Sequence, residues 1–102
     1  MRSITKLMNT YYIQYVITNI EKIYIEEYFK TLEKNLRKIV AVDVKHSFMQ
    51  SSKIYINVYA KGRDAAFISK QNLNLIKSIA VDSLNYVPED DLHLEIVKVE
   101  SV

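Results

Sequence analysis

The stretch ISKQN, residues 68–72, decides how this chain is interpreted, because it lies between two short segments with helical patterning. Just before it, Asp64 is suited to cap a short helical turn, since an Asp side chain accepts hydrogen bonds from the first free amides of a helix. After it, apolar residues recur at helical spacing until Pro88 disfavours helical backbone at the residue before it. The sequence therefore predicts a helix, a loop over residues 69–72 and a second helix.

The region upstream carries a long amphipathic pattern. The tetrapeptide TNIE, residues 18–21, has the form of a capping box, in which the side chains of Thr18 and Glu21 each accept a hydrogen bond from the other residue's amide. Charged residues fill the positions between the apolar ones, as expected of a helix with one face in a core. A helix is therefore predicted from residue 18 to residue 39, with the apolar stripe Ile20, Ile23, Tyr24, Tyr28, Leu32, Leu36 and Ile39.

From residue 39 the hydrophobic period changes to two, which is typical of a half-buried strand. This alternation runs to residue 48 and resumes over residues 53–60, after the polar tripeptide QSS at residues 50–52. Two such strands with a short polar connection predict an antiparallel hairpin. A further strand is predicted over residues 92–99, where Leu and Ile alternate with polar residues.

The N-terminal 18 residues are harder to assign. Residues 1–10 show no periodicity and are interpreted as an extended arm. The segment YYIQYVI, residues 11–17, is rich in aromatic and β-branched residues, which fits either a strand or a buried strap. The predicted division is an arm and strap over residues 1–18 and one domain over residues 19–100.

Composition limits the possible chemistry. A chain of 102 residues is expected to form one domain, and the absence of cysteine leaves no disulfide or thiolate metal site. The two histidines have no metal-binding spacing, so no cofactor is expected. Neither a membrane span nor a constellation typical of an enzyme is found. The net charge of +2 predicts that any contact with nucleic acid is local.

The residues themselves add a resemblance. Taken together, several segments are similar to the KH domain of the S-three family of small-subunit ribosomal proteins. The resemblance covers roughly residues 20 to 100. The segments are YIEEYF at 24–29, LRKI at 36–39, IYINVYA at 54–60, Arg63, FISKQN at 67–72, LIK at 75–77 and LHLEIVKV at 92–99.

This resemblance implies an α+β fold of type II KH order: helix, strand, strand, helix, loop, helix, strand. It implies a three-stranded sheet with the helices on one face. It also implies a structural role in the small ribosomal subunit, with ribosomal RNA and neighbouring ribosomal proteins as partners. The second domain of the family has no counterpart here, so a separate chain supplying it is a further expected partner. Because the composition suggests an AT-rich genome, a mitochondrial ribosome is the expected location, and the cytoplasm of a low-GC bacterium is the alternative.

The loop would be the RNA-contacting site of such a domain. KH loops have the form Gly-x-x-Gly, because glycine allows the RNA backbone to approach the amides closely. Ser69 and Asn72 stand at the glycine positions here, so the loop is degenerate. The expected RNA-binding residues are the loop and the cations around it: Lys61, Arg63, Ser69, Lys70, Gln71, Asn72 and Lys77. The alternative is that the helix-loop-helix only packs against the sheet.

Other readings of the same segments stay open. Tyr55 and Tyr59 share the outward face of one predicted strand, where they could stack on bases or pack across strands and against a protein partner. A free-standing KH protein acting as an RNA chaperone is a second function. A third is a protein interaction module with a ferredoxin-like fold, in which residues 11–17 form the first strand.

Overall fold

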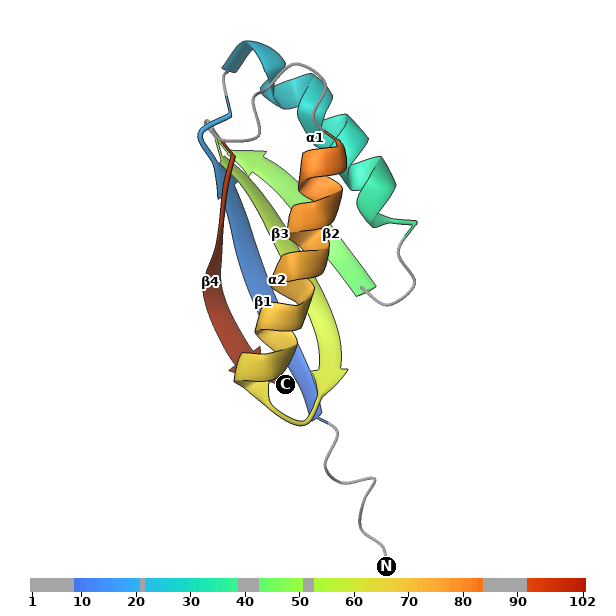
Figure 1. The fold of residues 1–102 in the computed structure, drawn as a ribbon, viewed down its shortest axis with the longest axis vertical. Helices are drawn as coiled ribbons and strands as arrows, with labels where there is room; N and C mark the ends of the chain where they lie inside the picture. The colour runs from blue at the N-terminus through green and yellow to red at the C-terminus, as the bar shows by residue number, and fades with distance from the viewer. Residues whose placement is uncertain (1–8, 21, 39–42, 51–52, 84–91) are drawn as a thin grey trace, which may run out of the picture.

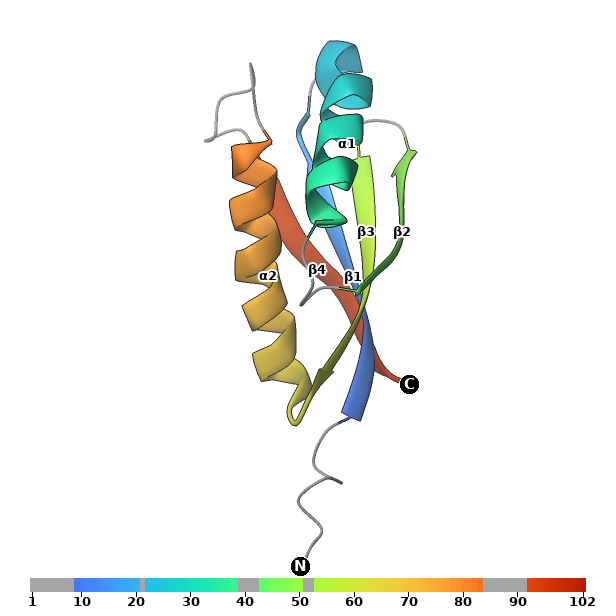
Figure 2. The ribbon, with the colours of Figure 1, turned by 90° about the vertical axis from the view of Figure 1, so that its right-hand side faces the viewer.

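A computed structural model of the chain describes residues 9–20, 22–38, 43–50, 53–83 and 92–102. Four strands form one sheet, and two helices pack on one of its faces (Figures 1 and 2). The expected α+β class with helices on one face is confirmed. In chain order, the elements are β1 (Asn9–Thr18), α1 (Lys22–Leu36), β2 (Asp43–Gln50), β3 (Lys53–Gly62), α2 (Ala65–Asp82) and β4 (His93–Ser101).

The strand order in the sheet is β2-β3-β1-β4, and every neighbouring pair is antiparallel. The element order strand, helix, strand, strand, helix, strand with this arrangement is that of a ferredoxin-like fold. The sheet therefore has four strands rather than the three expected from the resemblance. The additional strand is β1, which the sequence left undecided between strand and strap.

Strand β1 lies at the centre of the sheet, between β3 and β4. Ile13, Tyr15 and Ile17 alternate toward the helices and are fully buried. The interpretation of residues 11–17 as a strand is therefore correct. The boundary predicted after residue 18, between an arm and a domain, separates β1 from the sheet to which it belongs. Directly after β1, Asn19 has a φ of 72°, a conformation that Asn tolerates better than most residues.

Helix α1 confirms the predicted amphipathic helix, although it ends earlier than expected. Its buried side is formed by Ile25, Tyr28, Leu32 and Leu36. Ile23, which the sequence pattern placed in the same stripe, is 78% exposed. Residues 21 and 39–42, on which the capping box and the start of the next strand depend, lie outside the described residues.

The hairpin of β2 and β3 and the strand β4 are confirmed, while the turn at residues 51–52 and the predicted helix stop before Pro88 lie outside the described residues.

Each of the two edge strands, β2 and β4, carries one register irregularity. On β4, Lys98 pairs with Gln14 and Ile96 with Tyr15, which leaves Val97 as an extra residue. A similar shift occurs on β2 between residues 44 and 46. Bulges of this kind hinder further strands from adding to a sheet edge.

The predicted loop at residues 69–72 is wrong, because α2 runs through it without interruption. The prediction of Asp64 as N-cap is correct: its carboxylate accepts a hydrogen bond from the Ala66 amide at 2.9 Å. Ser69 and Asn72 face the core, where each donates a side-chain hydrogen bond to a carbonyl of its own helix, at Ala66 and Ile68 respectively. Small polar residues can occupy a helix in this way, so the helical stripe continues through positions that appeared to break it.

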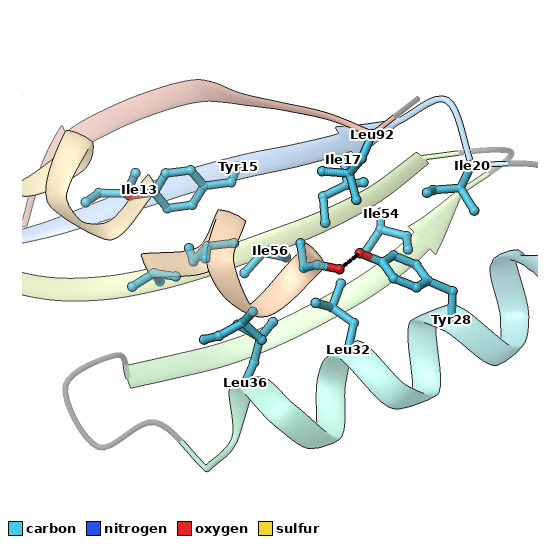
Figure 3. Packing of buried hydrophobic residues seen from close by; sticks show 14 of the residues in the cluster. Ile13, Tyr15, Ile17, Ile20, Tyr28, Leu32, Leu36, Ile54, Ile56 and Leu92 are labelled. Atoms are coloured by element: carbon cyan, nitrogen blue, oxygen red, sulfur yellow. Dashed lines mark hydrogen bonds between the residues drawn. The ribbon is translucent and has the colours of Figure 1, made fainter. Parts of the chain in front are cut away.

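Two buried tyrosines connect α2 to β1 and α1 by hydrogen bonds. The Tyr15 hydroxyl on β1 donates to the Ser69 carbonyl at 2.9 Å, and the Tyr28 hydroxyl on α1 donates to the Ala80 carbonyl at 2.8 Å. Figure 3 shows the second of these bonds among the apolar side chains of α1, β1 and β3. Buried hydroxyls need such partners, because an unpaired one would carry a desolvation cost.

Candidate nucleic-acid interface

The face of the sheet opposite the helices is covered by none of the described elements (Figure 2). Because side chains alternate along a strand, every second residue of the two central strands points to this side. We call it the open face. Its central positions are Tyr12, Gln14 and Val16 on β1 and, opposite them in register, Tyr59, Asn57 and Tyr55 on β3.

Three of these six positions are tyrosines with partly exposed rings. The rings of Tyr12 and Tyr59 are cross-strand neighbours, with centroids 5.3 Å apart and planes inclined by 51°. Tyr55 lies opposite Val16, four residues before Tyr59 on β3. The open face therefore presents an aromatic surface at the middle of the sheet rather than at its edge.

A hydrogen-bond network underlies this surface. The side-chain oxygen of Asn57, which is only 2% exposed, accepts from the Tyr12 hydroxyl at 2.8 Å and from the Gln14 amide at 2.9 Å. The hydrogen bond at the Tyr12 hydroxyl holds the Tyr12 ring in one orientation. A ring held in one orientation loses less conformational entropy when a flat partner stacks on it.

Cations lie around the tyrosines. The ammonium of Lys98 on β4 lies 5.5 Å from the centroid of the Tyr12 ring, and 3.9 Å from the Glu100 carboxylate. Both Lys98 and Glu100 are about half exposed, so this ion pair contributes little stability. Lys53 and Lys61, at the two ends of β3, are exposed as well. The open face thus combines aromatic rings with exposed positive charges.

The residues expected from the sequence to bind RNA separate into three groups. Ser69 and Asn72 are 4% and 5% exposed and face the core, which corrects their assignment as loop residues. Lys70 and Lys77 are exposed on the outer side of α2, and Arg63 is exposed in the connection just before this helix. Lys61 and Gln71 are exposed and lie with Asn72 at a pocket of about 390 Å³ between β3 and α2.

The sequence pattern missed Tyr12, the residue that completes the aromatic surface. The outward positions of Tyr55 and Tyr59 followed from their alternation on one strand. Tyr12 could be added only once residues 11–17 were known to pair with that strand. The signal available in the sequence was the alternation within YYIQYVI. In an extended strand, Tyr12 and Gln14 point to one face, and Tyr11, Ile13 and Tyr15 point to the other.

Two further polar groups are the buried phenols of Tyr15 and Tyr28. Burial raises the pKa of the Tyr15 and Tyr28 phenols well above the ordinary value for tyrosine, so both stay protonated and act as donors. Within the described ranges, no three His, Asp or Glu side chains gather in a way that could hold a metal ion. Neither α1 nor α2 is long and apolar enough to cross a lipid bilayer.

Comparison with known proteins supports the fold. No protein-family model matches the chain, and no curated protein matches it in sequence. A solved C-terminal segment of the alpha subunit of aIF2 from Pyrococcus abyssi is similar, with a TM-score of 0.50 and 15% identity over 87% of this chain. The chain spans 49% of the length of that segment. The de novo designed protein Foldit4 has a TM-score of 0.40 and 11% identity, over 89% of this chain and 94% of its own.

Proposed function

We propose that this chain is a noncatalytic RNA-binding protein that holds single-stranded RNA on its open face. The observation that carries the proposal is the group of three tyrosines, Tyr12, Tyr55 and Tyr59, on the two central strands. Every nucleobase offers a flat face, and stacking on aromatic side chains is the usual way in which proteins hold unpaired bases. Some RNA-binding domains use a four-stranded sheet with aromatic residues in this way.

The charges on the open face favour the same ligand. Lys53 and Lys61 lie two positions from Tyr55 and Tyr59 on the same side of β3, and Lys98 lies over the Tyr12 ring, so all three could contact phosphates of a strand whose bases are stacked. Glu100 moderates the charge of Lys98. With a net charge of only +2, the chain lacks the general basic surface that would bind nucleic acid without aromatic contacts. Base stacking is therefore the main attraction in this proposal, with phosphate contacts as a supplement.

The assembly we propose for this activity is the small ribosomal subunit, with ribosomal RNA and neighbouring ribosomal proteins as partners. The proposal rests on the resemblance over residues 20–100, and the solved segment of similar fold belongs to the translation factor aIF2. A mitochondrial ribosome is the proposed location, with the cytoplasm of a low-GC bacterium as the alternative. Sedimentation of the tagged protein with small subunits at high magnesium tests this. Recovery of all the protein at the top of the gradient would rule it out.

A second function uses the same surface. Tyrosine is common in protein interfaces, and the packing of Tyr12 against Tyr59 would also suit a flat protein partner. The ferredoxin-like topology favours this alternative over a free-standing KH protein, whose glycine loop is replaced here by the continuous helix α2. Light scattering during gel filtration separates the two functions, because a self-associating open face gives a dimer whose mass falls in the tyrosine variants.

The direct test is fluorescence anisotropy with a single-stranded oligonucleotide of about twelve nucleotides. Loss of one stacked base costs about 1–3 kcal/mol, so Tyr12→Ala and Tyr59→Ala should each weaken binding roughly 5- to 150-fold. Tyr24→Ala, on α1, is the matched control and should bind like the unchanged protein. If the tyrosine variants keep the circular dichroism spectrum and the full affinity, the open face is not the RNA site.

A further inference from the structure

The outer side of α2 carries an ordered row of cations. Lys70 and Lys77 are exposed on α2 and lie seven residues apart, which is close to two helical turns, and Arg63 is exposed just before the Asp64 cap. Lys70 and Lys77 therefore lie on one side of the helix, about 10 Å apart along its axis. Between Asp64, which caps the helix, and Asp82 at its end, α2 contains no acidic residue. We call these three residues the α2 basic row.

The row differs from the charged surface of α1. On α1, lysines alternate with glutamates, and just after the helix Arg37 forms an ion pair with Glu33 at 3.3 Å. None of the three cations of the α2 basic row forms an ion pair within the part of the chain that the structure describes. Mixed charges are ordinary for a solvated helix, whereas a row of one sign produces a positive potential that attracts a polyanion.

We infer that the α2 basic row binds the phosphate backbone of a second, double-helical segment of RNA. The inference rests on the proposed function, since it assigns a second contact to the same class of ligand. Exposed lysine and arginine side chains suit phosphates, and phosphate contacts position a duplex without reading its bases. The row offers one aromatic neighbour, Phe67, so it lacks the cluster of rings needed to stack unpaired bases.

The α2 basic row and the open face lie on opposite sides of the molecule. Since α2 covers one face of the sheet, its exposed side points away from the open face (Figure 2). One molecule could therefore hold a single strand on the tyrosines and a duplex on α2, joining two RNA segments. A membrane surface suits the row less well, because the apolar side of α2 is buried against the sheet and cannot enter a bilayer.

The test measures bridging with matched charge variants. A single-stranded oligonucleotide is fixed to beads, and retention of a labelled hairpin duplex is measured after protein is added. The unchanged protein should retain the duplex, whereas Lys70→Gln/Lys77→Gln should lose retention and keep its affinity for the single strand. Lys30→Gln/Lys34→Gln, which removes two exposed lysines from α1, is the control and should retain the duplex.

Salt dependence and vesicles complete the test. For the duplex alone, the slope of log affinity against log salt should be smaller by about 2 in Lys70→Gln/Lys77→Gln, because each phosphate contact contributes about 0.9. Equal slopes in all variants would overturn the inference. Lysine-dependent flotation with anionic vesicles, combined with unchanged duplex binding, would overturn it as well. If only the proposed function fails, the results differ from these. Single-strand binding would then be unchanged in Tyr12→Ala, while duplex binding would still depend on Lys70 and Lys77.

Discussion

The two faces of the sheet place the same residue type in opposite settings. On the covered face, Tyr15 is fully buried, and its hydroxyl donates to a backbone carbonyl of α2. On the open face, Tyr12, three residues earlier on the same strand, keeps part of its ring exposed and donates to the side chain of Asn57. The first tyrosine joins two elements of secondary structure, whereas the second has a ring that a ligand can reach. Residue type alone therefore does not indicate the role, but the face of the strand does.

The strongest test of this comparison removes one ring from each face. Tyr15→Ala should lower the free energy of unfolding by about 3–5 kcal/mol, because it empties a volume that the surrounding core cannot fully close. Such a loss is a large part of the roughly 5–15 kcal/mol available to a domain of this size. Tyr12→Ala should cost less, about 1–2 kcal/mol, because this partly exposed ring loses one hydrogen bond to Asn57 and its packing on Tyr59. Urea unfolding measures both, and equal losses would contradict the comparison.

A smaller effect is expected where β3 ends against α2. A Cβ atom added at Gly62 would lie 3.0 Å from the Cβ of Ile68, so Ile68 would have to shift by a few tenths of an ångström. Gly62→Ala should therefore cost about 1–3 kcal/mol, the usual range for excess volume in a packed core. Lys61→Ala changes the adjacent exposed position and should leave the urea midpoint almost unchanged. A Gly62→Ala protein as stable as the original would mean that this contact can relax.

The smallest effect concerns the two buried hydroxyls. Burial raises the pKa values of Tyr15 and Tyr28, while the unfolded chain ionises near the ordinary value of about 10. Below pH 10 both states keep the proton; above it the unfolded state releases protons first, so stability falls as the pH rises. Tyr15→Phe/Tyr28→Phe should lose about 1 kcal/mol per hydrogen bond at pH 7 and show a shallower decline between pH 9 and 11.

This decline can be followed by urea midpoints at several pH values. Ile56→Val is a suitable control, because it weakens the same core without removing a hydroxyl. The control should decline above pH 10 as steeply as the unchanged protein. An identical decline in the double Phe variant would show that these two hydroxyls do not cause it.

Much of the fold could be predicted from local patterns. The helix of residues 22–36, the hairpin and β4 have strong periodicity, and the cap at Asp64 has a specific chemistry. The loop prediction failed because residues 69–72 were placed between two separate helical patterns, with Ser69 and Asn72 at the glycine positions of a KH loop. Both residues are buried members of the apolar stripe, with polar groups that bond to the helix itself. Apolar periodicity cannot detect a helix face that includes small polar residues.

The candidate site was less accessible to sequence analysis, because it depends on pairing between distant segments. Tyr12 and Tyr59 are 47 positions apart in the chain and become neighbours only through the register of β1 and β3. Local patterns place each tyrosine on a strand face but do not give this register. By contrast, Lys70 and Lys77 belong to one helix, so their alignment follows from their spacing once α2 is known to run through residues 69–72.

The central place of β1 has a consequence for how the molecule forms. Its partners are β3, which begins 35 residues after β1 ends, and β4, which begins 75 residues after it. During synthesis, β1 is made first but has no complete set of neighbours until β4 has left the ribosome. Pairing between such distant segments slows folding, and an apolar strand that waits for its partners is exposed to aggregation. We therefore expect the nascent chain to gain its structure late and in one step, rather than progressively from the N-terminus.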